Sequence, residues 1–304
     1  MQDFSGTRRL LSLAAAVFLP AAAGLAQQTA KVVEKNDVIY GRADGAALLA
    51  DIAYPNGKTQ LPAILMVHGG RWRAGTRTDA SYAKQAQWAQ DGFFAMNIDY
   101  RLVNSTPAPA CYQDMYTALR WLHAHAAEYG IDVNRIYLMG NSSGGHEVAL
   151  AATLGEGPYA KTGGWEKESA DFRAAISFSG AYDLNTLSWG NLWTPLSGDQ
   201  STGFATLTGA ALEQARHLAS PLHNVSAQTK PILLLHSDDD RSVPIQQAVD
   251  MDKALTAAHV FHKFIHYTDR GHIGFTDEAM REAHSFIAGL ESGAHSTAGA
   301  SAQR

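Results

Sequence analysis

The sequence predicts an α/β fold in which a mostly parallel central sheet is flanked by helices. Strand-like and helix-like segments alternate along most of the chain, and this alternation is typical of a parallel sheet with helical crossovers. The strand-like segments include continuous apolar runs such as 62–67, as expected where both faces of a strand are buried. With 304 residues, 46% apolar and 17% charged, the chain is long enough to bury a substantial core in one large domain.

The first expected elements form a hairpin at one edge of the sheet. Asp44-Gly45 is a turn signal between strand-like segments at 38–40 and 48–53, so these two strands should be antiparallel. We expect the later strands at 62–67, 93–100, a run ending at 140, 174–179, 231–236 and 260–267. We expect helices at 82–91, 111–129, a segment running through 148–154, 245–258 and 276–290. The helix over 111–129 should stop at Gly130, because glycine is a common helix terminator.

The N-terminal segment 1–26 has the pattern of an export signal. Arg8 and Arg9 precede an apolar, alanine-rich run, and the segment ends in Gly24-Leu25-Ala26, which resembles a signal-peptidase site. We therefore expect cleavage after Ala26 and a periplasmic or secreted protein, exported by the general or the twin-arginine route. A membrane anchor is disfavoured, because a stable span needs about 20 strongly apolar residues.

A single domain is expected over residues 27–291. Segment 186–220 breaks the strand–helix alternation, since it has aromatic residues and four glycines without a clear period, and we expect an insertion or small cap there. Segment 292–304 is small, polar and alanine-rich, which predicts a flexible tail.

Charge and cysteine content exclude several function classes. The formal net charge is −5 and no basic block is present, so nucleic acid is not an expected partner. Cys111 is the only cysteine, which rules out an intramolecular disulfide and a cysteine-based zinc site and favours a small buried side chain. His262 and His266 share a strand face, yet no carboxylate spacing supports a metal site and His-Glu-x-x-His is absent. No metal and no organic cofactor is expected.

The turn Gly140-Asn-Ser-Ser-Gly144 has the Gly-x-Ser-x-Gly pattern of a nucleophile elbow between a strand and a helix. The serine at its apex has a strained backbone, and side chains two residues before and after it would collide. Gly140 and Gly144 fit those places only if Ser142, rather than Ser143, is at the apex. A glycine-rich helix entry that binds an anion or merely turns is the alternative interpretation of this pattern alone.

Two later strands end in residues that would complete a catalytic triad. A serine hydroxyl needs a base, and the base needs an orienting acid. The strand 231–236 runs into three consecutive aspartates, 238–240, and the strand 260–267 runs toward His272. Both candidates thus leave the carboxyl ends of strands, the edge where open α/β sheets place their sites, in the order Ser, Asp, His. A solvated acidic loop and a surface histidine are the alternatives.

The chain resembles the α/β-hydrolase superfamily, and within it the small carboxylesterases with a His-Gly-Gly oxyanion loop. The resemblance covers about Val38 to Leu290 and lies in five blocks: His68-Gly69-Gly70-Arg71-Trp72, Ile98-Asp99-Tyr100-Arg101-Leu102, the helix before the elbow with Gly130-Ile-Asp-Val-Asn-Arg135, Asp240-Arg-Ser-Val243-Pro244 and Gly271-His272. It implies an α/β-hydrolase fold and identifies Asp240 as the acid, with Asp238 the neighbouring alternative.

The resemblance also implies an oxyanion hole made of backbone N–H groups. Ser143 should supply one, and Gly70 and Arg71 the others from the loop after the strand 62–67. Small residues are typical of such a loop, because its backbone must approach the substrate closely. Most relatives have a small or aromatic residue where this chain has Arg71. That arginine would either favour acidic or phenolic-acid substrates or simply face solvent.

The sequence also predicts where several side chains near the motifs lie. Four aromatic residues are expected to line the substrate pocket, and a place in the core is the alternative for them: Trp72, Tyr182, Trp189 and Trp193. His68 should shape the oxyanion loop by hydrogen bonding, and His146 should pack beneath the elbow. Tyr100 and Arg101 should brace the fold.

The sequence therefore predicts an exported serine carboxylesterase with catalytic residues Ser142, Asp240 and His272. Its substrate would be a small-molecule or polysaccharide-linked ester, such as an acetyl or feruloyl ester of plant polysaccharide. A serine peptidase of the prolyl-oligopeptidase type and a non-catalytic binding protein with the same fold are the alternatives. Such peptidases normally have a large preceding domain.

Overall fold

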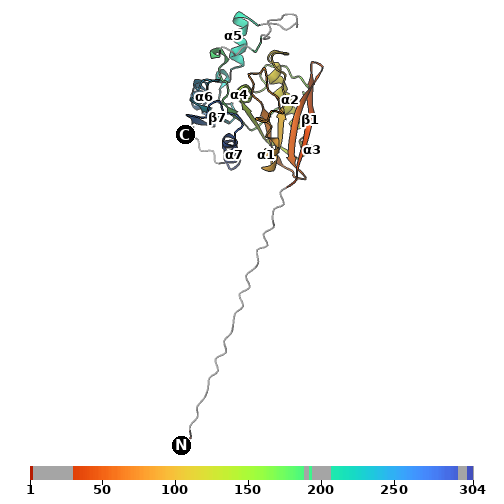
Figure 1. Cartoon of the computed structure of the whole chain (residues 1–304), viewed down its shortest axis with the longest axis vertical. Coiled ribbons are helices and arrows are strands. Elements are labelled where there is room, and N and C mark those ends of the chain that lie inside the picture. The colour runs from red at the N-terminus through yellow and green to blue at the C-terminus, as the bar shows by residue number, and fades with distance from the viewer. Residues whose placement is uncertain (3–29, 188–191, 194–206, 294–299, 304) are drawn as a thin grey trace.

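The computed structural model describes residues 1–2, 30–187, 192–193, 207–293 and 300–303 (Figure 1). Over these residues the chain forms a nine-stranded sheet in the order β1-β2-β4-β3-β5-β6-β7-β8-β9. Its strands are β1 (Val32–Ala43), β2 (Ala46–Pro55), β3 (Leu61–Val67), β4 (Phe94–Ile98), β5 (Ile131–Asn141), β6 (Ala174–Phe178), β7 (Ile232–Ser237), β8 (His262–Tyr267) and β9 (Ala300–Gln303). The hairpin β1–β2 and the β2–β4 pair are antiparallel and the other pairs are parallel. The α/β prediction and the edge hairpin are confirmed.

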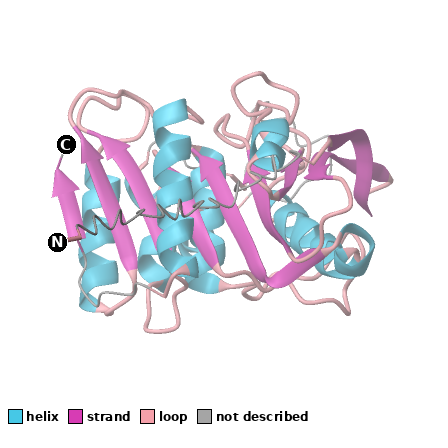
Figure 2. Cartoon of the chain, turned by 90° about the horizontal axis from the view of Figure 1, so that it is seen from below, coloured by secondary structure: helices cyan, strands magenta, loops and turns pink. Residues whose placement is uncertain are grey.

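Helices cover both faces of the sheet (Figure 2). They are α1 (Gln85–Gln90), α2 (Ala110–Ala124), α3 (Ala126–Tyr129), α4 (Ser143–Leu154), α5 (Gly209–Leu218), α6 (Gln246–Ala257) and α7 (Asp277–Glu291), with short 3-10 turns η1 (Leu184–Thr186) and η3 (Pro221–Asn224). Alternate residues of each strand point to opposite faces. In β3, Leu65 belongs to the core cluster that contains residues of α2, α4 and α6, whereas Met66 belongs to the cluster that contains residues of α1 and α7.

The helix expected over 111–129 is two helices in the structure. α2 ends at Ala124, and α3 begins after His125. The imidazole of His125 hydrogen-bonds the carbonyl of Trp121 at 2.9 Å. A side chain therefore competes for a carbonyl that in a continuous helix accepts only from a backbone N–H. Gly130 ends α3 in the left-handed conformation, as expected of a helix-terminating glycine.

Two segments contain elements that the sequence did not predict. Segment 186–220 contains α5, which lies beyond the sheet at the top of Figure 1, although the sequence showed no clear period there. Leu212 and Ala215 of α5 pack against the core. The expectation of a flexible tail at 292–304 is wrong for residues 300–303, because β9 pairs in parallel with β8. Backbone pairing of this kind needs no apolar pattern in the added strand, so composition did not reveal it.

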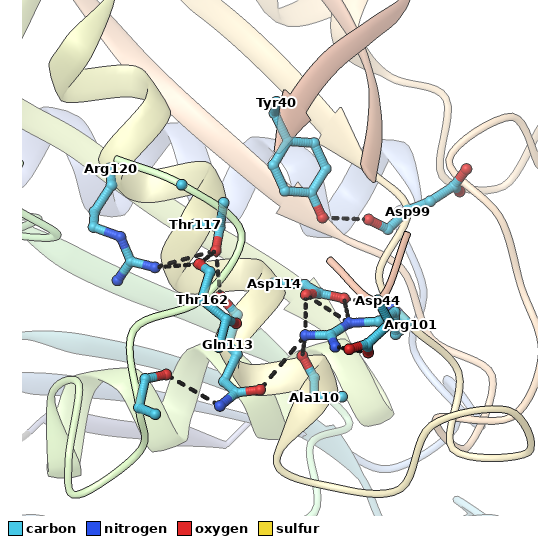
Figure 3. Close-up of polar contacts among 12 residues, drawn as sticks. Tyr40, Asp44, Asp99, Arg101, Ala110, Gln113, Asp114, Thr117, Arg120 and Thr162 are labelled. Atoms are coloured by element: carbon cyan, nitrogen blue, oxygen red, sulfur yellow. Dashed lines mark hydrogen bonds and ion pairs between the residues drawn. The ribbon is translucent and has the colours of Figure 1, made fainter. Parts of the chain in front are cut away.

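The chain following β4 is anchored by Arg101, as Figure 3 shows. The guanidinium of Arg101 pairs with Asp114 of α2 at 2.7 Å and with Asp44 of the β1–β2 turn at 2.5 Å. The hydroxyl of Tyr40 donates to the carbonyl of Asp99 at 2.6 Å (Figure 3). These contacts hold the residues that follow β4 against the hairpin and α2, and Arg101 braces the fold as expected.

Elsewhere the described residues match other sequence expectations. Cys111, near the start of α2, is fully buried in the core. No helix in these ranges is both long enough and apolar enough to cross a bilayer. Segment 1–26 lies outside the described residues except for 1–2, so the export signal stays a prediction.

Candidate active site

Ser142 lies at the sharp turn between β5 and α4. Its backbone has φ 55° and ψ −118°, a conformation that L-residues rarely adopt and that strand–serine–helix elbows impose. A Cβ built on Gly140 would lie 2.4 Å from the carbonyl of Gly144. A Cβ built on Gly144 would lie 2.1 Å from the carbonyl oxygen of Val67. The steric reason for both glycines, with Ser142 at the apex, is confirmed.

Ser143 is the first residue of α4 and is fully buried. Its hydroxyl lies 3.3 Å from the hydroxyl of Tyr100, within hydrogen-bonding distance. The side chain of Ser143 is thus committed to the interior, whereas Ser142 keeps 7% of its surface exposed. The geometry and the glycine spacing therefore identify the same residue, Ser142, as the candidate nucleophile.

His272 and Asp240 form a bidentate contact. The imidazole Nδ1 lies 2.8 Å from Oδ2 and 3.0 Å from Oδ1 of the carboxylate. The backbone N–H groups of Ser242 and Val243 donate to Oδ1 at 2.8 and 3.0 Å. This places Nδ1 of His272 on the acid and leaves Nε2 for a proton acceptor role.

The three consecutive aspartates have three different partners. Asp238 pairs with His266 at 2.6 Å on the surface. Asp239 accepts from the Ser237 hydroxyl and from the Gly271 N–H, both at 2.7 Å. Asp240 alone reaches His272, so the structure brings together the acid and base that the resemblance implied and leaves Asp238 apart.

Asp240 stays ionised. Burial alone would raise the pKa of its carboxyl, but hydrogen bonds from His236 and His272 and from the Val243 N–H outweigh that effect and lower the pKa far below its usual range. His236 lies 3.3 Å from the carboxylate and is itself fully buried. A permanent negative charge therefore faces the imidazole of His272.

Hydrogen bonds of neighbouring residues tie the histidine loop to the elbow. The side chain of Asn141 donates to the carbonyl of Ile273 at 3.4 Å, and the N–H of Ile273 donates to the Ser179 hydroxyl at 2.9 Å. The N–H of Ser142 donates to the carbonyl of Phe178 at 2.8 Å. Among the described residues no hydrogen bond joins Ser142 Oγ directly to His272, a separation common in enzymes without substrate.

The loop after β3 folds back on itself at Gly70. Gly70 has φ +124°, and its carbonyl accepts from the N–H groups of Arg73 and Ala74 at 3.0 and 3.1 Å. A Cβ on Gly70 would lie 2.0 Å from the carbonyl oxygen of Ala74, so only glycine fits. Arg71 and Trp72 also have positive φ, 55° and 59°. The tight turn brings the loop backbone close to the start of α4, where Gly144 touches Val67.

His68 has a structural position in this loop, as expected. It is fully buried, its Nδ1 lies 2.7 Å from the carbonyl of Gly69, and its ring stacks on Tyr100 with centroids 4.3 Å apart. Burial lowers the pKa of His68, which favours the neutral ring. His146 is also buried, beneath the elbow, where desolvation lowers its pKa to about 4. Neither ring contacts the Asp240 carboxylate as the ring of His272 does.

The aromatic residues expected at the pocket have mixed outcomes. Tyr182 is fully buried and its hydroxyl lies 2.8 Å from the Ser177 hydroxyl, which is the core position that the sequence left as its alternative. Trp72 packs edge-on against His146 and is 1% exposed, and Trp193 is 7% exposed. Their pocket roles stay predictions. Trp189 lies outside the described residues.

A small cavity next to His272 was not foreseen. It has a volume of about 150 Å³ and is lined by Tyr267, Arg270, His272, Ile273, Thr276, Glu278 and Ala279. Arg270 could have been suspected from its place two residues before His272. The residues of α7 could not, because nothing local in the sequence shows that this helix lies against the histidine loop. Across the described ranges, no group of three or more histidine, cysteine, aspartate or glutamate side chains is arranged to hold a metal ion.

Comparison with known proteins gives a family and a fold. The family model described as BD-FAE matches residues 50–255. The probable carboxylic ester hydrolase LipM of Mycobacterium tuberculosis is 29% identical over 231 residues, 75% of this chain and 52% of that protein. Esterase LipC of the same organism is 28% identical over 237 residues, 75% of this chain and 56% of that protein. The chain thus spans about half the length of these curated relatives.

Solved structures share the fold. A truncated carbohydrate esterase from gut microbiota superposes with a TM-score of 0.72 at 24% identity, covering 88% of this chain and 99% of that one. Esterase Est2 of Thermogutta terrifontis, a planctomycete, superposes with a TM-score of 0.69 at 22% identity, covering 86% of this chain and 93% of that one. At these sequence identities, the two comparisons show a shared fold.

Proposed function

The chain belongs to the BD-FAE family, and on this premise we propose that it is a serine carboxylesterase that works through an acyl-enzyme intermediate. The observation that supports the proposal most is the contact of His272 with both oxygens of Asp240, on a loop tied to the Ser142 elbow. Folding alone does not require a strained serine, a histidine base and an ionised aspartate to lie at the same edge of the sheet. They are the parts that ester hydrolysis requires.

In the first half-reaction, His272 Nε2 takes the proton of Ser142 Oγ while the oxygen attacks the ester carbonyl carbon. The carbonyl oxygen becomes an oxyanion, which accepts hydrogen bonds from the backbone N–H groups of Ser143, Gly70 and Arg71. The tetrahedral intermediate collapses, the bond to the alcohol oxygen breaks, and His272 gives its proton to the departing alcohol. The acyl group stays on Ser142.

In the second half-reaction, water replaces the alcohol. His272 takes a proton from water as the water oxygen attacks the acyl carbon, and a second tetrahedral intermediate forms. Its collapse breaks the bond to Ser142 Oγ, which regains a proton from His272. Asp240 holds the imidazole in the correct tautomer and stabilises the imidazolium in both steps without being protonated itself.

The substrate and location form the finer part of the proposal. An acetyl or feruloyl ester of plant polysaccharide, met outside the cytoplasm after export through segment 1–26, is the proposed natural target. The likeness in fold to a carbohydrate esterase of gut microbiota and the arginine at position 71 in the oxyanion loop favour it.

Turnover by wild-type protein and a Ser142→Ala variant tests the activity. The substrates are nitrophenyl esters of rising acyl length, acetylated xylan and methyl ferulate. We expect ester turnover that falls at least a thousandfold in Ser142→Ala. The matched control is Ser292→Ala, an exposed serine at the end of α7, which should keep full activity.

Labelling with a fluorophosphonate identifies the nucleophile independently. The mass of the wild-type protein should increase by one phosphonyl group, and that of Ser142→Ala should not. Unchanged turnover in Ser142→Ala would contradict the nucleophile assignment. An unlabelled wild-type protein without esterase activity would support a binding protein, and hydrolysis of a prolyl amide without ester turnover would support a peptidase.

A further inference from the structure

The hydroxyl of Tyr100 contacts both segments that would supply the oxyanion hole. It lies 3.2 Å from the carbonyl oxygen of His68, on the loop that leads to Gly70. It also lies 3.3 Å from Ser143 Oγ, at the first residue of α4. Tyr100 itself follows β4, so one side chain from a third segment joins the other two.

The direction of these hydrogen bonds follows from the groups involved. A carbonyl oxygen can only accept, so the Tyr100 hydroxyl hydrogen must go to His68. The Ser143 hydroxyl must then donate to the Tyr100 oxygen. The result is a directed chain from Ser143 to Tyr100 to the backbone of His68.

The surroundings keep this chain of hydrogen bonds in place. Ser143 and His68 are fully buried and Tyr100 is 4% exposed, so water does not compete strongly for these groups. The ring of Tyr100 stacks on the imidazole of His68, with an angle of 17° between the planes. Burial raises the pKa of the Tyr100 hydroxyl well above its usual value, so the hydroxyl stays protonated and able to donate.

The two segments have to be held at one separation, because their N–H groups must converge on a single oxygen atom. Displacements of about 1 Å at such donors cost up to a hundredfold in rate. Backbone pairing joins β3 and β5 up to Val67 and Gly140, and the contact of Gly144 with Val67 limits how close the segments beyond these strands can come. Past the strand ends, a hydrogen-bonded bridge limits how far the two segments can move apart.

We propose that Tyr100 is a positioning residue that sets the distance between the Ser143 donor and the Gly70–Arg71 donors of the oxyanion hole. The inference rests on the proposed esterase function and adds a residue that touches no substrate. Removing the hydroxyl should leave substrate binding intact and weaken the stabilisation of the oxyanion.

Tyr100→Phe tests this, because it keeps the ring that stacks on His68 and deletes only the bridging hydroxyl. We expect kcat for a nitrophenyl acetate ester to fall about tenfold, the value of one hydrogen bond, with KM within about twofold of wild type. The affinity for a trifluoromethyl ketone, whose serine adduct places an oxyanion in the hole, should fall by a similar factor.

The matched control is Tyr116→Phe. Tyr116 is a buried tyrosine of α2 whose hydroxyl also donates to a carbonyl, that of Gly155, away from the elbow. It should lose comparable thermal stability and keep kcat. A full kcat in Tyr100→Phe, or an equal loss in both variants, would overturn the positioning role.

Ser143→Ala removes the same bridge from its other end and keeps the backbone N–H. The loss in the double variant with Tyr100→Phe should be no larger than the greater single loss, since both substitutions break one chain. If Tyr100→Phe does not fold, Ser143→Ala decides alone, and an undiminished kcat refutes the inference. Failure of the esterase proposal is separate, because it would appear as activity that survives Ser142→Ala.

Discussion

Asp240 and His272 meet across the carboxyl ends of two neighbouring strands, with both carboxylate oxygens within 3.0 Å of the imidazole Nδ1. β7 and β8 pair in register from Ile232 with His262 to Ser237 with Tyr267. That register brings the residues after each strand to the same level. The contact is therefore a product of strand pairing, and it distinguishes one aspartate among three.

Asp240→Asn should lower kcat about a thousandfold or more while leaving the fold intact, because an amide cannot hold the imidazole in the required tautomer. Asp238→Asn is the matched control, since Asp238 pairs with His266 and not with His272. Its kcat should stay within about twofold of wild type. Steady-state turnover of a nitrophenyl ester measures both, and an equal loss in the two variants would contradict the assignment of Asp240.

The depressed pKa of Asp240 predicts a pH dependence of stability. An aspartate in an unfolded chain has a pKa of about 3.9, above that of the folded carboxyl. Its stabilisation is therefore fully present above about pH 4 and is lost as the pH falls toward the folded value. Urea unfolding between pH 7 and 3 measures the free energy of unfolding. As the pH falls, this free energy should decrease less in Asp240→Asn than in wild type.

The control for that measurement is Asp171→Asn, a surface carboxylate paired with Lys230. Its pH profile should follow that of the wild type. A wild-type slope that is retained in Asp240→Asn would show that other carboxylates cause the acid sensitivity.

Glu147 of α4 predicts an effect of the opposite sign. It is fully buried, neither carboxyl oxygen has a hydrogen-bond partner, and burial followed by the charge of Asp114 raises its pKa well above the usual value. Above about pH 4.3 the unfolded glutamate ionises while the folded one keeps its proton, so stability falls as the pH rises. Glu147→Gln should therefore be more stable than wild type at pH 8, by about 1–3 kcal/mol, and nearly equal at pH 4.

Urea unfolding of wild type, Glu147→Gln and Glu168→Gln at the two pH values checks this. Glu168 is exposed, and its substitution should change the free energy of unfolding by less than about 0.5 kcal/mol at either pH. A Glu147→Gln variant that is less stable than wild type at pH 8 would show that the charged carboxylate is stabilised by contacts formed in solution.

Gly70→Ala should reduce both stability and kcat. Its Cβ would overlap the carbonyl of Ala74 at 2.0 Å, so the turn that carries the proposed donors must open. We expect a loss of about 2–4 kcal/mol in the free energy of unfolding and at least a hundredfold loss of kcat.

Gly92→Ala separates backbone strain from the clash at Gly70. Gly92 also has a positive φ, +93°, but a Cβ there would meet no atom within 4 Å. The Gly92→Ala substitution should lower the free energy of unfolding by about 1 kcal/mol, measured by thermal unfolding. Turnover of a nitrophenyl ester should show an unchanged kcat. A Gly70→Ala enzyme with full kcat would place the oxyanion donors elsewhere.

Much of the fold could be predicted because its signals are local. Buried parallel strands are apolar on both faces, and the hairpin turn at Asp44-Gly45 is a property of two residues. Helix α5 and strand β9 were not predicted. α5 is a short helix without a fully buried residue, inside a segment whose other residues show no clear period, and β9 joins the sheet by backbone pairing to β8.

The sequence by itself determined the elbow and its apex. A side chain at position 140 would collide with Gly144, within five residues of chain, and the spacing of these two glycines distinguishes Ser142 from Ser143. A side chain at position 144 is excluded by Val67 and His68, at the end of β3. Only the tertiary structure decided which aspartate contacts His272, that Tyr182 is buried, and that Tyr100 joins Ser143 to His68. Those contacts cross between strands and helices far apart in the chain, and strand register and packing, which no local pattern encodes, bring them together.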